Sequence, residues 1–174
     1  MTDTTSAPLD DATRRMLRHA VATLAYRAGK VLRDAPAGFG EVRASASSRS
    51  AAEILGHMVD LLAWGERLAR GEYRWEAHGV TDWSTAVTRF FDGLAALDRA
   101  LAETTVPLSA EVLFQGPIAD ALTHTGQLAM LRGLAGAAVR PESYARATIE
   151  AGRVGVDQVA PGREFDGDAS RPAR

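Results

Sequence analysis

Apolar residues recur every three to four positions along most of this chain, and this spacing limits the folds open to it more than any other feature. The spacing matches one face of an α-helix, which turns once every 3.6 residues. It spans about residues 10–34, 50–70, 81–101 and 117–135, and no stretch alternates apolar and polar residues as half-buried strands do. Four long helices, each with one apolar face, predict an all-α fold, a four-helix bundle.

The apolar faces define the expected core. The inward positions are Leu17, Val21, Leu24, Ala28 and Val31 in the first helix, Ile54, His57 or Met58, Leu61, Trp64 and Leu68 in the second, and Val87, Phe90, Phe91, Leu94, Leu97 and Leu101 in the third. Because the whole chain has 174 residues, we expect one domain, ordered over about residues 10–165 with flexible ends.

Local signals mark the expected helix ends. Ser50 with Glu53 three residues later fits a capping box, and Thr81 with Asp82 can cap the third helix. Pro117 suits the first position of the fourth helix, where its missing N–H costs nothing, and Gly136 can end that helix. A short extra C-terminal helix is predicted over residues 141–152, followed by an extended tail.

Composition excludes several classes of protein. The net charge of −2 gives no basic surface for nucleic acid, and no apolar run approaches the ~20 residues of a membrane span. The polar, acidic N-terminus lacks the features of a signal peptide, so we expect a cytoplasmic protein. The absence of cysteine rules out disulfides, thiolate metal ligands and a cysteine nucleophile.

The segment "EVLFQGP", residues 111–117, matches the cleavage signal of viral 3C-type proteases. Such a signal normally joins a tag to a terminus, but this one lies two thirds of the way along the chain. The helical pattern continues across it and no histidine run flanks it. We therefore interpret it as native sequence, in a connection that a 3C-type protease could cut between Gln115 and Gly116 if it is exposed.

Only four histidines occur, and two of them fall on apolar faces. His57 lies on the apolar face of the second helix, and His124 follows Asp120 by four residues, so that these two side chains project from one side of the fourth helix. His19 lies off the apolar face and His78 lies in a loop, and both fit surface positions better than a site.

Spacing alone leaves two interpretations of Asp120, His57 and His124 open. In one, Asp120 is an exposed first-turn residue favoured by the helix dipole, and the two histidines are hydrogen-bonded core residues. In the other, the three side chains converge on a metal ion, since a buried carboxylate is costly unless it is paired or metal-bound. The Asp-x-x-x-His pattern is common in helices by chance, so the spacing by itself favours the first interpretation over a metal site.

Two segments, "AEILGHMVDLLAWGERLARGE" and "GPIADALTHTGQLAMLRGLAG", together resemble the DinB-like superfamily of four-helix bundles. The resemblance covers about residues 10–165 and implies a divalent-metal site made by His57, Asp120 and His124. Asp120 stands where the family pattern has a histidine. A carboxylate at this position also occurs in the related mycothiol-dependent maleylpyruvate isomerases, so this departure does not abolish the site.

The resemblance also implies a chemistry and a partner. Two imidazoles and one carboxylate leave zinc, or nickel, with an open position and a net charge of +1, which favours a bound thiolate. Some relatives are thiol S-transferases that use mycothiol, bacillithiol or glutathione, which implies a small thiol and an electrophilic substrate here. The alternative is a non-catalytic dimeric bundle that acts as a binding or stress-linked protein. Bundles of this family often pair, so a homodimer is expected in either case.

Four further positions are candidates for supporting roles. Gln127 can orient His124, and Asp60 can orient His57 unless it faces solvent. Trp64 can form a wall of the pocket or pack in the core. Arg27 and Lys30 can bind the carboxylate of a thiol cofactor or form a solvated face of the first helix.

Overall fold

The computed structural model describes residues 9–79, 82–103 and 109–165, and helices dominate these residues. The long helices are α1 (Asp11–Leu32), α2 (Ala51–Ala69) and α3 (Trp83–Glu103). A fourth helical run consists of α4 (Ala110–Leu113), the π turn η2 (Phe114–Ile118) and α5 (Ala119–Leu134). Single 3₁₀ turns occur at η1 (Phe39–Glu41) and η3 (Tyr144–Arg146). The described part of the chain contains isolated β-bridges but no strand, which confirms the predicted all-α class.

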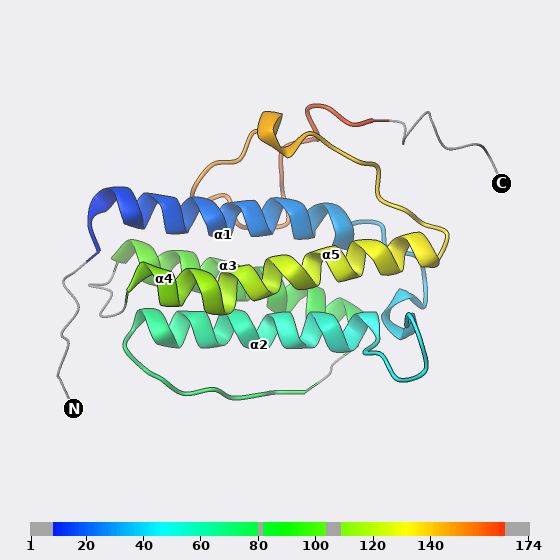
Figure 1. Ribbon diagram of the computed structural model, residues 1–174, viewed down its shortest axis with the longest axis horizontal. Coiled ribbons are helices and arrows are strands. Elements are labelled where there is room, and N and C mark those ends of the chain that lie inside the picture. The colour runs from blue at the N-terminus through cyan, green and yellow to red at the C-terminus, as the bar shows by residue number, and fades with distance from the viewer. Residues whose placement is uncertain (1–8, 80–81, 104–108, 166–174) are drawn as a thin grey trace.

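The four helical runs enclose one apolar core. Helix α1 contacts α3 and α5, and α2 contacts the same two helices, so the runs form the ring α1–α3–α2–α5. They lie side by side along the long axis of the molecule (Figure 1). The largest fully buried side chains of the long helices are Leu24, Leu55, Met58, Leu62, Leu68, Phe90, Leu94, Leu97 and Leu101, which come from the predicted apolar faces or their neighbours.

Side-chain caps fix the starts of these helices. The hydroxyl of Ser50 accepts a hydrogen bond from the backbone N–H of Glu53 at 3.2 Å, and the Glu53 carboxylate accepts from the N–H of Ser50 at 2.6 Å. This confirms the predicted capping box. Asp82 accepts from the backbone N–H of Thr85 at 3.0 Å and so caps α3 as predicted. Thr81, the other predicted cap, lies outside the described residues.

The fourth helical run begins earlier than the sequence predicted. Ser109 caps it by accepting from the backbone N–H of Val112 at 3.4 Å, so that the run begins at Ala110, seven residues before the predicted start at Pro117. Pro117 lies inside the run, within the π turn η2, where the wider turn tolerates its missing N–H. The buried Pro117 ring packs against α2, where a Cβ added at Gly65 would come within 3.1 Å of it. Pro117 is therefore a packing residue of a bulged helix and not a helix start.

The helix predicted over residues 141–152 is wrong, because only the 3₁₀ turn η3 forms there. This segment is held by contacts to other parts of the chain. The N–H of Phe165 donates to the carbonyl of Pro141 at 2.8 Å, and the N–H of Ser143 donates to the carbonyl of Arg163 at 3.1 Å. These bonds hold the segment in a mainly irregular conformation across α1 (Figure 1). The predicted flexibility of the chain ends concerns mainly residues outside those described.

Within the described ranges, no helix combines the length and the apolar character that crossing a bilayer demands.

Candidate metal centre

Three of the predicted site residues come together on two adjacent helices. His57 lies on α2, two turns after its Ser50 cap, and Asp120 and His124 lie one turn apart on α5. One ligand atom from each of the three side chains can be chosen so that all lie within 4.8 Å of one another. His124 is buried, and His57 and Asp120 are half-buried. The three residues are thus close enough to hold a metal ion.

The carboxylate of Asp120 lies slightly too far from the two imidazoles for direct hydrogen bonds. Nε2 of His57 lies 3.5 Å from one carboxylate oxygen of Asp120, and Nε2 of His124 lies 3.4 Å from the other. Both distances exceed the ~2.7–3.2 Å usual for N–H···O bonds. Two ligands held ~2.0–2.1 Å from a tetrahedral zinc ion lie about 3.3 Å apart. Each imidazole thus faces a different oxygen of the carboxylate, at a separation close to that between two ligands of one ion.

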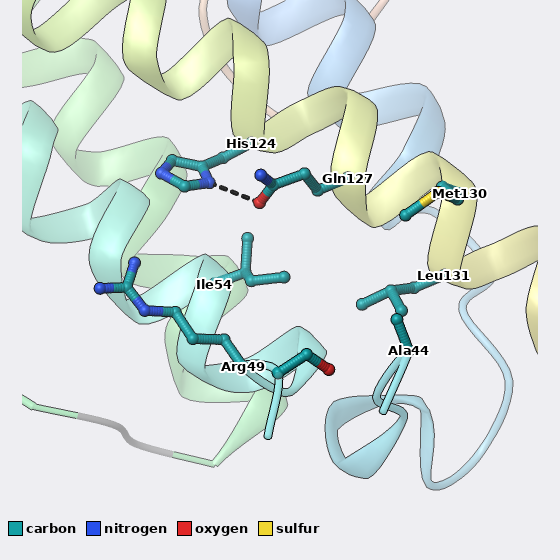
Figure 2. A pocket seen from close by; sticks show the side chains of 8 residues that line it. Ala44, Arg49, Ile54, His124, Gln127, Met130 and Leu131 are labelled. Atoms are coloured by element: carbon teal, nitrogen blue, oxygen red, sulfur yellow. Dashed lines mark hydrogen bonds between the residues drawn. The ribbon is translucent and has the colours of Figure 1, made fainter. Parts of the chain in front are cut away.

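Gln127 orients His124, as its position one helical turn later predicted. Its side-chain oxygen lies 2.8 Å from Nδ1 of His124 (Figure 2). Because an amide oxygen only accepts hydrogen bonds, Nδ1 is the donor, and in the neutral ring the lone pair is then on Nε2. Nε2 is the atom that faces Asp120. The neutral tautomer set by Gln127 is the one that a metal at this position requires.

The surroundings of His57 favour the neutral form of its imidazole. Its pKa is lowered first by burial and then by electrostatic interaction with His124 and Arg49, while Asp120 acts in the opposite direction. The ring of Trp75 lies 5.8 Å from the His57 ring, centroid to centroid. A neutral imidazole is the form that binds metals, so burial at this position favours ligation.

Asp60 does neither of the two things the sequence suggested. It is buried, so it does not face solvent, and it does not orient His57. Its carboxylate accepts from the backbone N–H of His78 at 3.1 Å and lies 3.0 Å from the His78 ring. This contact fixes the connection after α2, and that connection places the Trp75 ring beside the His57 ring. His78 is thus part of the support of the site, as an anchor of this connection.

Two cavities flank the three residues. A cavity of 310 Å³ lies on the side of His124 (Figure 2), and its lining consists of Ala44, Ser48, Arg49, Ile54, His124, Gln127, Met130 and Leu131. A cavity of 440 Å³ lies on the side of His57, with a more polar lining: Arg43, Ala46, Ser47, Ser48, Arg49, Glu53, Gly56, His57, Asp60, Ala77 and Gly79. Ser48 and Arg49 belong to both linings. The triad is therefore open to small molecules from two sides.

The cations proposed from the sequence lie elsewhere. Lys30 pairs with Glu142 at 2.8 Å and with Glu164 at 2.7 Å, and Arg27 lies over the ring of Tyr144. Neither residue lines the two cavities. Both side chains contact the C-terminal segment that lies on α1; Arg27 is exposed, as the solvated-face alternative predicted, whereas the Lys30 side chain is mostly buried.

The sequence reasoning missed Arg49, the cation that does line the site. It precedes the Ser50 cap of the helix that carries His57, and this proximity is the one signal that pointed to it. Trp64 lines neither cavity and packs edge-on against Trp75, at 5.7 Å between centroids, which fits the packing interpretation. His19 is exposed, as expected.

No protein-family model, curated protein or solved structure matches this chain. The resemblance to the DinB-like superfamily therefore rests on the two sequence segments that carry it. The convergence of His57, Asp120 and His124 is a separate observation, because it comes from the packing of α2 against α5.

Proposed function

We propose that this chain is a metal-dependent enzyme of DinB-like type that transfers a small thiol to an electrophile or uses the thiol to isomerise it. His57, Asp120 and His124 would hold the ion, with zinc the first candidate and nickel the second. The observation that carries the proposal is the convergence of these three donors between two open cavities.

The donor set fits such an ion. Two neutral imidazoles and one carboxylate leave a net charge of +1 and an open position. When bound, the ion supplies a positive charge that lowers the pKa of a thiol placed next to it. Gln127 holds the His124 tautomer, and burial keeps His57 neutral, so that both rings present a lone pair.

The two cavities suit the two reactants. The cavity beside His57 is lined by charged and hydroxyl side chains, among them Arg43, Ser47 and Glu53, which suit the polar groups of a low-molecular-weight thiol. The cavity beside His124 has a mainly apolar wall, which suits the electrophile. In transfer, the thiol proton goes to solvent, the sulfur forms a bond to carbon, and the leaving group departs with the electron pair of its own bond. In isomerisation, the sulfur later leaves with the pair that it brought.

Metal content tests the first half of the proposal. We expect wild-type protein reconstituted with zinc or nickel to retain about one equivalent of metal by mass spectrometry after desalting. His124→Ala should lose it, and His19→Ala, which removes an exposed histidine, should not. Absence of metal from the reconstituted wild type would sink the proposal and return the three residues to hydrogen-bonded core positions.

Thiol binding tests the second half. Nickel-loaded protein should develop a sulfur-to-nickel charge-transfer absorption band when mycothiol, bacillithiol or glutathione is added, and apoprotein should not. A protein that binds metal but none of these thiols would instead be the non-catalytic binding protein. The expected homodimer is checked on the same samples by sedimentation velocity.

A further inference from the structure

Arg49 is an exposed cation at the junction of the two cavities. Among the described residues its side chain forms no hydrogen bond or ion pair, whereas Arg43, six residues earlier, donates to the Ser48 carbonyl and to Glu53. Arg49 lines both cavities. It is also close enough to His57 for its charge to act on that ring. An unpaired guanidinium at this position offers several hydrogen-bond donors to an incoming anion.

The cavity beside His124 has a polar end and an apolar end. In Figure 2 the guanidinium of Arg49 and the ring of His124 lie at one end of the view, with Met130 and Leu131 at the other and Ile54 between them. A ligand that satisfies both ends needs an anionic group attached to an apolar body. The volume of 310 Å³ equals that of about ten waters, which limits the ligand to a small molecule.

We propose that this cavity binds a small carboxylate with an apolar chain or ring, and that Arg49 binds its carboxylate. The apolar body then packs on Ile54, Met130 and Leu131. Guanidinium and carboxylate match as planar groups with two parallel hydrogen bonds. The lining of this cavity contains one cationic side chain, which suits a singly charged carboxylate better than a dianionic phosphate. The identification of this carboxylate as the electrophile rests on the function proposed above, but its binding to Arg49 does not.

The test compares hexanoate with hexan-1-ol on metal-free protein, followed by amide chemical shifts in NMR titrations. These probes share an apolar chain and differ in charge. We expect hexanoate to bind more tightly than hexan-1-ol, and Arg49→Gln to weaken hexanoate about tenfold while leaving hexan-1-ol unchanged. Arg15→Gln, which removes an exposed arginine of α1, is the matched control for net charge and should change neither affinity. Met130→Gln should weaken both probes.

Equal affinity of wild type and Arg49→Gln for hexanoate would overturn the proposal, as would equal affinity of the wild type for the two probes. Repeating the titrations on zinc-loaded protein separates this proposal from the previous one. If hexanoate binds only to the zinc-loaded form and Arg49→Gln has no effect, the carboxylate is a metal ligand and the role of Arg49 is refuted. If the triad retains no zinc but Arg49 still selects hexanoate in the metal-free form, the proposed function fails and this inference stands.

Discussion

At the scale of single residues, the properties of the site depend on which nitrogen of His124 carries its proton. Gln127 is the residue that decides this, because its side-chain oxygen lies 2.8 Å from Nδ1. A histidine whose second nitrogen is not held can rotate or change tautomer, and loss of such a partner typically costs 10–100-fold in metal affinity. Gln127 should therefore affect metal affinity although it is not itself one of the three ligands.

We expect Gln127→Leu to weaken zinc binding about 10–100-fold, measured by competition with a chromophoric chelator. Gln127→Glu is the matched variant, because it keeps an oxygen acceptor of the same length, and it should bind zinc at least as tightly as the wild type. Similar affinities for the Leu and Glu variants would show that the hydrogen bond to Nδ1 has no part in ligation.

Residue spacing predicted one part of the site and not the other. Asp120, His124 and Gln127 share one helix, where the period of 3.6 residues fixes which side chains are neighbours. His57 was assigned to the same site through the resemblance to the DinB-like superfamily, because spacing along one helix does not relate it to a residue on another. The sequence did not predict the contact of Asp60 with His78, because His78 lies in a connection whose path no local pattern sets. The position of Arg49 was not predicted for the same reason.

At the scale of elements, the π turn η2 changes the interpretation of the protease-like segment. The sequence placed Gln115 and Gly116 in a connection, but both lie in helical conformation between α4 and α5. Residue spacing predicts a helix start at Pro117, and it carries no signal that a widened turn tolerates proline inside a helix. The fifth helix was wrong for a related reason, since long-range hydrogen bonds override the local preference of residues 141–152.

We expect the native protein to resist a 3C-type protease, because such enzymes bind extended segments and cleavage would require α4 and η2 to unfold locally. Gel electrophoresis over a time course should show intact chain under native conditions. A synthetic peptide spanning residues 109–120 should be cut between Gln115 and Gly116 under the same conditions. Cleavage of the native protein at the rate of the peptide would mean that this run opens readily.

The cap of α3 makes a pH-dependent contribution to stability. Hydrogen bonds from Thr85 and Ser84 lower the pKa of Asp82 from 3.8 to about 2. Because the folded-state pKa lies below the unfolded one, the unfolded chain binds more protons between these values. The contribution of the cap is therefore complete above about pH 4 and is lost as the pH falls toward 2.

Carbon-detected NMR should accordingly place the Asp82 titration near pH 2. Asp82→Asn keeps a capping oxygen without a titrating group, so its stability should fall less than that of the wild type between pH 4 and pH 2 in urea unfolding. An Asp82 titration at the ordinary value of 3.8 would show that the cap does not hold the carboxylate in solution.

At the scale of the whole molecule, one cluster of charges ties the end of the described chain to its beginning. Lys30, the only lysine of the chain, lies between Glu142 and Glu164. The hydroxyl of Tyr26 also donates to Glu142 at 2.6 Å, and burial together with this carboxylate raises the tyrosine pKa. The Lys30 side chain is 8% exposed and that of Glu142 is 0% exposed, so these charges have little solvent to screen them.

Removing one charge of this cluster should lower the free energy of unfolding more than removing one charge of an ordinary surface ion pair does. Lys30→Met leaves Glu142 buried with Tyr26 as its remaining partner, and we expect a loss of about 3 kcal/mol in the free energy of unfolding, measured in urea. Arg43→Met breaks the exposed pair with Glu53, which solvent screens, and should lower the free energy of unfolding much less than Lys30→Met does.

The double variant Lys30→Met/Glu142→Gln decides the cause of that loss. If the cost arises from an uncompensated buried charge, removing the charge of Glu142 should restore part of the stability, although it removes a second polar partner. If the cost arises from lost attraction alone, the double variant should be no more stable than Lys30→Met. A Lys30→Met protein as stable as Arg43→Met would mean that the C-terminal segment is held on α1 by its backbone hydrogen bonds and not by these charges.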